Sequence, residues 1–431
     1  MRKRVVFRRL TAVGMAGICI LAGAGCHQET EEAPIEITLM HGYGGTLESY
    51  QIMQEIYDEF SEKNPDIRLN SIAYINNQVA VEKANDMLAV GEMPDILSTN
   101  SLSYIIDNAV KTGMALDLMP YIEADPEWKE QIHPSVFETW ENEQGHLYTI
   151  PDALELIGYW YNEDYMMEAG IVDENGEPDL PETWEEFMQT AARLQEWING
   201  SGKDISVFSL EENQITEFLF PARLAGDGEE GMASVQDPEE GISRTALEHT
   251  VSDLRTLNAY SQGVDNIESA RQRFSEGKTV IYFNGVWESE ALEESGLKDS
   301  FGYAVYPSAD GGGISYVSPP SGYVLAKQED KQKEEACIRF LKYMLSDEVQ
   351  ERIAMETGQA PCNPKVSEET LAESGTLFGK SVEIVQTAEH QIKTLVCAWD
   401  AEKREILSEC LIPAMEDPVS MDLMEKKLGT D

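Results

Sequence analysis

The chain has 431 residues, of which 42% are hydrophobic, so it can bury the core of two or three domains and is not a disordered chain. Its 32 Lys and Arg residues stand against 79 Asp and Glu residues, which gives a formal net charge of -47 at pH 7. This negative charge repels nucleic acid and anionic lipid headgroups, so neither is expected as a ligand. The acidity is typical of a soluble surface outside the cell, and it also permits a cationic ligand.

The N-terminus has the layout of an export signal. Five basic residues between Arg2 and Arg9 precede the apolar, small-residue run LTAVGMAGICILAGAG. We therefore expect residues 1–25 to be a signal peptide that is removed. The ending LAGAGC resembles a bacterial lipobox, which implies lipidation of Cys26 and a polar tether over residues 26–34 at the outer face of the cell membrane. Free secretion is the alternative, and no later segment has 18 uninterrupted apolar residues.

The next 80 residues or so alternate between strand and helix patterns. The segment IEITLM predicts a strand that runs into the loop HGYGG, and apolar residues at helical spacing then predict a helix that stops before Pro65. The order repeats with a strand (IRLNSIAYI), a helix (78–90), a buried strand (PDILST) and a helix (LSYIIDNAV). This alternation predicts a mostly parallel sheet with helices on both faces. Ligands bind at the carboxyl ends of such strands, so HGYGG and STNS, at residues 98–101, are expected on one rim.

The pattern restarts near YTIPDALELIGYWYN. The segment PETWEEF carries a capping box, with Thr183 as N-cap and Glu186 three residues later, and opens a helix. The segments ISVFSL, TVIYFN and FGYAVY predict further strands, and Gly311 to Gly313 predict a loop or a crossing between lobes. Two α/β lobes are the simplest account of this restart.

Trp287 is the most informative of the seven tryptophans. It follows the predicted strand TVIYFN and the pair Asn284–Gly285, which is expected to form a turn. From position alone it is either a core residue or a flat platform at the rim of a sheet. Trp184 and Trp197 lie at helical spacing and are expected in the core.

No motif in the chain predicts catalysis or metal binding. The sequence contains no G-x-S-x-G, H-E-x-x-H or Walker A motif, and its six histidines lack metal-ligand spacing. Cys337 lies in a helical apolar pattern and is expected to be a small core residue. Disulfide pairing among Cys362, Cys397 and Cys410 is left open.

Several segments together resemble a known family. They are PDI at Pro94, IPDALELIGYWYNEDYMMEAGI followed by PETWEEF, GKTVIYFNGVW, GYAVYPSADGGG and EEACIRFLKYMLSDEVQERIAMETGQAPCNP. Their order is similar to that in family 1 extracellular solute-binding proteins, the carbohydrate-type receptors of bacterial ABC importers, which are related to maltose-binding protein. The resemblance covers nearly the whole mature chain.

The resemblance implies an α/β, type II periplasmic-binding-protein fold, in which hinge crossings join two α/β lobes with a ligand cleft between them. The implied crossings fall near Ile150 to Leu154, near Tyr306 to Gly313, and beyond Met344. The implied N-terminal lobe is 35–150 plus about 308–348, and the implied C-terminal lobe is 151–307 plus about 349–431.

The resemblance also implies a ligand site. The tryptophan of the NGVW-like segment stacks on a sugar ring in this family, which implies that role for Trp287. The implied carboxylate contacts are Glu155 and Glu212, the implied late tryptophan is Trp399, and Tyr43 and Asn100 follow from their positions on the two rim loops. A sugar has an apolar face that packs on an aromatic ring and hydroxyls that need donors and acceptors, so this residue set suits it.

The implied function is capture of a sugar or oligosaccharide for the permease of an ABC importer. The expected protein is a monomer without cofactor or metal, and it is not an enzyme, because transport chemistry belongs to the permease and its ATPase. Three alternatives stay open: the same scaffold binding a peptide, polyamine or other cation; an anchored glycoside-acting enzyme; and an adhesin or structural lipoprotein.

Overall fold

The computed structural model describes residues 33–99, 102–366, 371 and 376–430. Pro34–Asp431 form one compact unit. The predicted signal peptide, Cys26 and the tether up to residue 32 lie outside the described residues, as does Asn100. Within the described part of the chain, no helix combines the length and the apolar character needed to span a bilayer.

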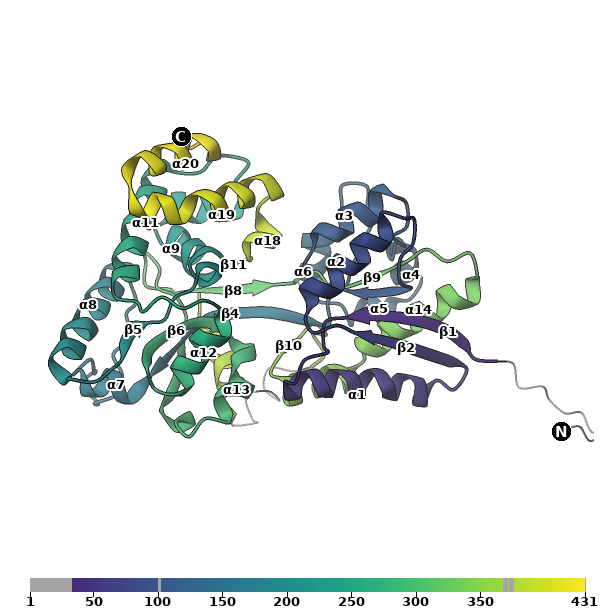
Figure 1. Ribbon diagram of the computed structural model, residues 1–431, viewed down its shortest axis with the longest axis horizontal. Helices are drawn as coiled ribbons and strands as arrows, with labels where there is room; N and C mark the ends of the chain where they lie inside the picture. Colours follow the sequence, from purple (N-terminus) through teal and green to yellow (C-terminus); the bar gives the residue numbers. More distant parts are fainter. Residues whose placement is uncertain (1–32, 100–101, 367–370, 372–375, 431) are drawn as a thin grey trace, which may run out of the picture. The chain divides into compact units, whose positions relative to one another are not determined.

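The first sheet has four strands in the order β2-β1-β3-β9 (Figure 1). Its strands are β1 (Ile35–His41), β2 (Ile67–Ala73), β3 (Ile96–Ser98) and β9 (Tyr323–Leu325). Strands β2 and β3 run parallel to β1, and β9 is antiparallel to β3. The prediction of a mostly parallel sheet is therefore confirmed for this part of the chain.

Helices cover both faces of the first sheet, as the alternation predicted. Ile37 and Leu39 of β1 pack in a core cluster with α1 (Glu48–Lys63) and α14 (Lys331–Met344). Met40, one residue further on, packs in a separate cluster with α2 (Asn77–Leu88) and α3 (Tyr104–Lys111). Successive side chains of a strand point to opposite faces, so Ile37 and Leu39 face one helical layer and Met40 faces the other.

The second sheet is mixed and is built around one long strand. Its order is β11-β8-β4-β6-β5, and β7 and β10 also pair with β4. The strands are β4 (Ala153–Asn162), β5 (Ser206–Phe208), β6 (Thr279–Gly285), β7 (Phe301–Ala304), β8 (Ile314–Ser318), β10 (Ala360–Pro361) and β11 (His390–Ile392). Helix α8 (Trp184–Ser201) begins at the predicted capping box, with both of its hydrogen bonds formed.

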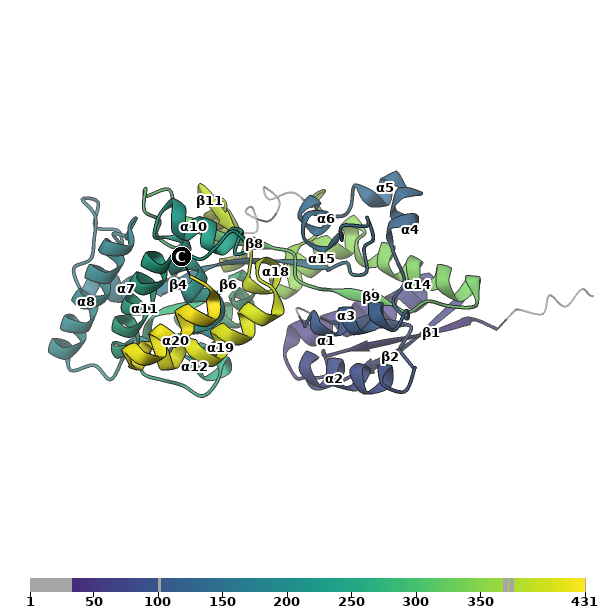
Figure 2. The same ribbon diagram turned by 90° about the horizontal axis from the view of Figure 1, so that it is seen from above.

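The remaining helices flank these sheets. They are α4 (Met119–Glu123), α5 (Pro126–Lys129), α6 (Pro134–Trp140), α7 (Glu163–Glu168), α9 (Phe220–Ala225), α10 (Glu229–Gln236), α11 (Arg244–Ala259), α12 (Ile267–Ser275), α13 (Ser289–Glu293), α15 (Asp347–Thr357), α17 (Leu377–Val385), α18 (Leu395–Ala398), α19 (Ala401–Glu416) and α20 (Pro418–Leu428). Short turns of other helix types are η1 (Gln214–Leu219), η2 (Val286–Glu288) and η3 (Lys298–Ser300). Helices α19 and α20 pack side by side (Figures 1 and 2).

The chain passes from the first sheet to the second and later returns to the first. Ile150 bridges Tyr323 of β9, and β4 of the second sheet begins at Ala153. The return falls at residues 319–322, between the end of β8 and the start of β9. The predicted crossing at Tyr306 to Gly313 is wrong, because Tyr306 bridges Ile314 at the start of β8, a strand that lies between β11 and β4 in the second sheet.

Two further placements bear on the predicted lobes. Residues 308–318 precede or form β8, so they belong with the second sheet and not with the first. Helix α15 packs along α1, where Arg352 pairs with Glu55 and Glu59. The four cysteines of the described chain are all unpaired, and Cys337 is a fully buried core residue, as predicted.

Candidate functional site

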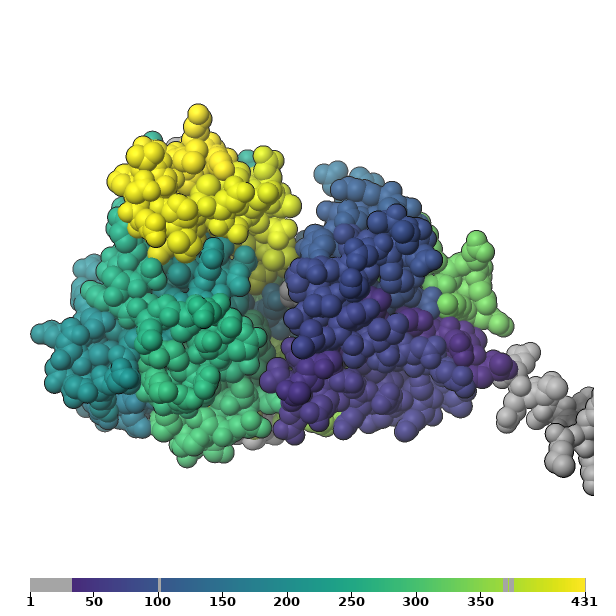
Figure 3. All heavy atoms as spheres, viewed as in Figure 1, coloured from purple at the N-terminus to yellow at the C-terminus, as the bar shows by residue number. Residues whose placement is uncertain are grey.

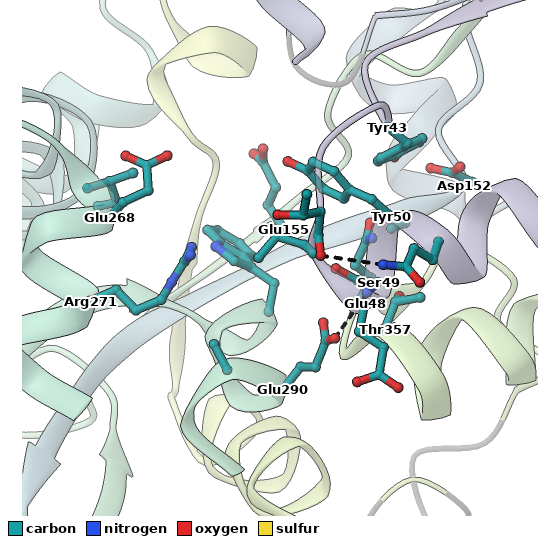
Figure 4. Close-up of a pocket in the computed structure, with 18 of the residues that line it drawn as sticks. Tyr43, Glu48, Ser49, Tyr50, Asp152, Glu155, Glu268, Arg271, Glu290 and Thr357 are labelled. Carbon is teal, nitrogen blue, oxygen red and sulfur yellow. Dashed lines mark hydrogen bonds between the residues drawn. The ribbon is translucent and has the colours of Figure 1, made fainter. Parts of the chain in front are cut away.

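A pocket of about 680 Å³ lies where the two sheets' connecting segments meet. The loop after β1 and the first turn of α1 form one wall, the start of β4 forms the floor, and residues between 267 and 294 form the opposite wall. In the space-filling view, purple residues of the N-terminal part lie next to green residues of the second half of the chain (Figure 3), in line with the hydrogen bond from the Ser49 backbone N–H to Glu290. Figure 4 shows Glu268 and Arg271 facing Tyr43, Tyr50 and Asp152 across this pocket.

Trp287 lies at the wall of this pocket, directly after β6. The prediction of a turn at Asn284–Gly285 is wrong, because both residues still pair with β4, at Gly158 and Ile157. The strand continues through Gly285, and Trp287 belongs to η2, the short helical turn that follows. Trp287 therefore reaches the pocket wall from the end of β6, without an intervening hairpin turn.

The indole of Trp287 packs directly against Gly285. A Cβ atom at Gly285 would meet three ring carbons at 2.2, 2.4 and 2.5 Å, so glycine is needed at this position for a close approach rather than for an unusual backbone angle. The indole is half-buried, packs against the second core cluster and has Phe218 at 6.3 Å between ring centroids. One side of the ring is thus supported by protein, while the residue lines an open pocket.

Glu155 and Tyr43 line the same pocket. Glu155 is the third residue of β4, pairs with Ser318 of β8 and is half-buried. Ile157 pairs with Gly285, so the antiparallel register carries Glu155 towards the place where β6 ends and Trp287 begins. Tyr43 comes from the other wall and is 2% exposed. Three of the predicted site residues are therefore brought together.

His41 holds the loop that carries Tyr43. The His41 Nδ1 accepts a hydrogen bond from the Tyr43 backbone N–H at 3.1 Å, and its Nε2 lies 2.7 Å from the Ser71 hydroxyl. Burial lowers the pKa of His41 to about 4, so the ring is neutral near pH 7 and can accept this bond. Gln54 of α1 donates to the Tyr43 carbonyl at 2.6 Å, which fixes the loop from its other side.

A buried chain of hydroxyl groups ends at Asp152, on the pocket floor. The Tyr57 and Tyr323 hydroxyls lie 2.8 Å apart, and Tyr323 donates to Asp152 Oδ2 at 2.6 Å. Burial raises the pKa of Asp152, and the Tyr323 hydrogen bond acts in the opposite direction. Asp152 therefore presents an oriented acceptor to the pocket.

Two carboxylates connect other parts of the site. Glu290 Oε1 accepts the backbone N–H of Ser49 at 3.0 Å, in the first turn of α1, where helix N–H groups have no partner within the helix. Burial raises the pKa of Glu290. Glu288 accepts two hydrogen bonds from Arg271, whose guanidinium lines the pocket.

The other predicted site residues lie elsewhere or outside the described chain. Glu212 is exposed next to η1 and is not among the described residues that line the pocket. Trp399 is 3% exposed; its indole N–H donates to the Val235 carbonyl at 3.2 Å and its ring packs edge-on against Phe220. Trp399 therefore lies in the second core and does not border this pocket. Asn100 lies outside the described residues.

Sequence reasoning missed Tyr50, Asp152, Arg271 and Glu290, all of which line the pocket. Tyr50 fits the apolar stripe of α1, and Arg271 lies in the polar part of an amphipathic helix, so neither stands out locally. Asp152 had a usable signal, since it lies three residues before Glu155 at the predicted crossing. Trp184 is buried as predicted, whereas Trp197 is half-buried against the same core.

The comparisons with known proteins agree with this fold. The model of the bacterial extracellular solute-binding protein family matches residues 55–379. None of the curated proteins matches the chain.

Three solved structures illustrate the similarity. A solute-binding protein of Streptococcus pneumoniae, solved with the blood group A-trisaccharide, is 22% identical, with 91% of this chain and 98% of that one covered and a TM-score of 0.73. A chitin oligosaccharide binding protein is 17% identical, with coverages of 92% and 98% and a TM-score of 0.72. The GacH receptor of Streptomyces glaucescens is 16% identical, with coverages of 92% and 97% and a TM-score of 0.71.

These likenesses confirm the predicted fold class of a two-part α/β solute-binding protein. The matched family model covers well over half of the chain. The chain therefore belongs to the bacterial extracellular solute-binding proteins.

Proposed function

We propose that this protein captures a sugar or oligosaccharide in the pocket beside Trp287 and delivers it to the permease of an ABC importer. The observation that carries the proposal is the half-buried indole of Trp287, which is backed by Gly285 and Phe218 and borders an open pocket. An aromatic ring supported on one side and open on the other suits the apolar face of a pyranose.

The polar groups around the indole suit sugar hydroxyls. Glu155 and Asp152 supply acceptors from the floor, and Tyr43 and Arg271 supply donors from opposite walls. Each hydrogen bond to a charged group contributes about 1.5 to 3 kcal/mol. Two such bonds contribute about 3 to 6 kcal/mol, so packing on the indole has to supply the rest of the about 8 kcal/mol that micromolar affinity requires.

The similar structures support a saccharide as the ligand class. Their descriptions name a blood group A-trisaccharide, a chitin oligosaccharide and acarbose as the molecules that those proteins bind. Raffinose is named for another structure of the same fold. This chain shares their fold, and its pocket is lined by Trp287 and by several carboxylates.

Export, anchoring and assembly complete the proposal. We infer that residues 1–25 direct export, that Cys26 is lipidated and holds the protein at the outer face of the membrane, and that the protein works as a monomer. The two parts of the fold would close on the ligand by a hinge motion, with boundaries near Ile150 to Leu154 and at 319–322. The protein catalyses no reaction, because import is driven by the permease and its ATPase.

A thermal-shift screen of mono- and oligosaccharides tests this function. A ligand that binds only the folded state raises the melting temperature by mass action. The best saccharide should bind in the micromolar range by calorimetry, and Trp287→Ala should abolish binding, while Trp197→Ala, at a half-buried tryptophan outside the pocket lining, should not. Recovery of the saccharide unchanged excludes a glycoside-acting enzyme. Shifts with polyamines or peptides alone would contradict the proposal.

A further inference from the structure

Arg271 is the only basic side chain among the described residues that line the pocket. Helix α12 carries it, and its guanidinium extends into the pocket (Figure 4). Its Nε and Nη2 donate to the two carboxylate oxygens of Glu288 at 2.5 and 2.9 Å. This pair uses one edge of the guanidinium, and no hydrogen bond joins Nη1 to another residue in the described part of the chain. Nη1 is therefore available to a ligand.

Burial of the Glu288 carboxylate removes it from water, which is unfavourable unless the carboxylate has a partner. It is 1% exposed, and a carboxylate in such a place needs a partner with good geometry. The bidentate contact with Arg271 provides one, and it restrains the guanidinium in a fixed plane. Glu288 directly follows Trp287 in η2. One short turn thus supplies both the aromatic platform and the inward anchor of the arginine.

The other charged groups of the pocket are all acceptors. The carboxylates that line it are Glu48, Asp152, Glu155, Glu268, Glu290 and Glu294. Sugar hydroxyls can donate to these groups, but ring oxygens, acetal oxygens and acetamido carbonyls only accept. Among the charged side chains of the lining, Arg271 alone can donate to them.

The same arrangement disfavours acidic ligands. Glu288 already neutralises the charge of Arg271, so a ligand carboxylate gains little attraction from the guanidinium. It also faces the repulsion of the surrounding carboxylates in a partly desolvated pocket. An uncharged saccharide is not repelled by these carboxylates.

We propose that Arg271 is the specificity-determining donor of this pocket, that Glu288 positions and neutralises it, and that the pair selects uncharged saccharides over acidic ones. This inference rests on the proposed sugar-binding function. It adds the charge class of the ligand and assigns two residues that the sequence did not suggest.

Calorimetric titration of wild type and two variants tests the inference. The probes are the neutral oligosaccharide with the largest thermal shift and an oligogalacturonide of the same length. Wild type should bind the neutral sugar at least 100-fold more tightly. Arg271→Lys, which keeps the charge but loses the planar fork, should weaken neutral binding at least tenfold. Glu288→Gln leaves the guanidinium charge unneutralised, so the ratio between the affinities for the neutral sugar and for the oligogalacturonide should fall at least tenfold.

A change in this affinity ratio distinguishes a positioning role of Glu288 from a general structural role. Loss of a general structural role would weaken the binding of both sugars by the same factor. Glu334→Gln is the matched control, since Glu334 is 3% exposed, is bonded to Lys331 and Tyr121, and is not among the described lining residues. Arg339→Lys, at an exposed arginine, controls for the other substitution. Neither control should alter affinity or preference.

Three outcomes would overturn the inference: tight binding of the oligogalacturonide by wild type, unchanged neutral affinity in Arg271→Lys, or an unchanged preference in folded Glu288→Gln. If Glu288→Gln melts below the assay temperature, the Arg271→Lys titration and the wild-type preference decide the matter. Failure of wild type to bind any saccharide would instead refute the proposed function itself.

Discussion

Gly285→Ala displaces the indole of Trp287 without removing it. The added methyl carbon would lie 2.2 to 2.5 Å from three ring carbons, whereas carbon atoms in ordinary contact lie about 3.5 to 4.0 Å apart. The ring therefore has to move by more than about 1 Å, and the open side is towards the pocket. The backbone of Gly285 is extended, with φ -80° and ψ 178°, so alanine is tolerated there without strain.

We expect Gly285→Ala to weaken saccharide binding at least tenfold, or about 1.4 kcal/mol, while the protein still folds. Isothermal titration measures the affinity, and a thermal melt confirms folding. Gly200→Ala is the matched control, because a Cβ at Gly200 meets nothing within 4 Å. Full affinity in Gly285→Ala would refute the assignment of Trp287 as the platform.

Three further changes test other parts of the site. Glu155→Gln should weaken saccharide binding about fivefold to tenfold in a titration, because a neutral amide accepts about half as strongly as a carboxylate, and Glu212→Gln should change nothing. Burial raises the pKa of Asp152, so its charged form destabilises the folded state at a pH above that pKa, and Asp152→Asn should raise the melting temperature at pH 7. This rise in melting temperature should shrink as the pH falls towards 4. A rise that is the same at every pH would contradict the raised pKa. His41 is kept neutral in the folded state, so the free energy of unfolding should fall by roughly 3 kcal/mol in total as the pH is lowered from 6.5 to about 4. Denaturant unfolding of His41→Gln should lack this pH dependence.

Local patterns predicted the elements of the fold well. The strand pattern of β1, the helices on both sides of it and the capping box at Thr183 all follow from periodicity and hydrogen-bonding chemistry within short windows. The crossing near Tyr306 was misplaced because the glycine run at 311–313 suits a hairpin loop as well as a crossing, and only the pairing of Tyr306 with Ile314 distinguishes the two.

The site was predicted in part, for a physical reason. Trp287 follows the end of a predicted strand, where position along the sequence indicates the rim of a sheet, whereas Glu155 was implied only by the resemblance to the family. Arg271 reaches the pocket from a helix, and its partner Glu288 is 17 residues away, so no local pattern connects them. Trp399 has the right residue type, but the contact of its indole with Val235 places it in the core.

The most direct test of the central claim is a crystal structure of the protein with the saccharide that gives the largest thermal shift. The account predicts a pyranose ring lying parallel to the Trp287 indole, with hydroxyls within hydrogen-bond distance of Glu155. A saccharide bound elsewhere, with the Trp287 indole facing only solvent, would contradict it.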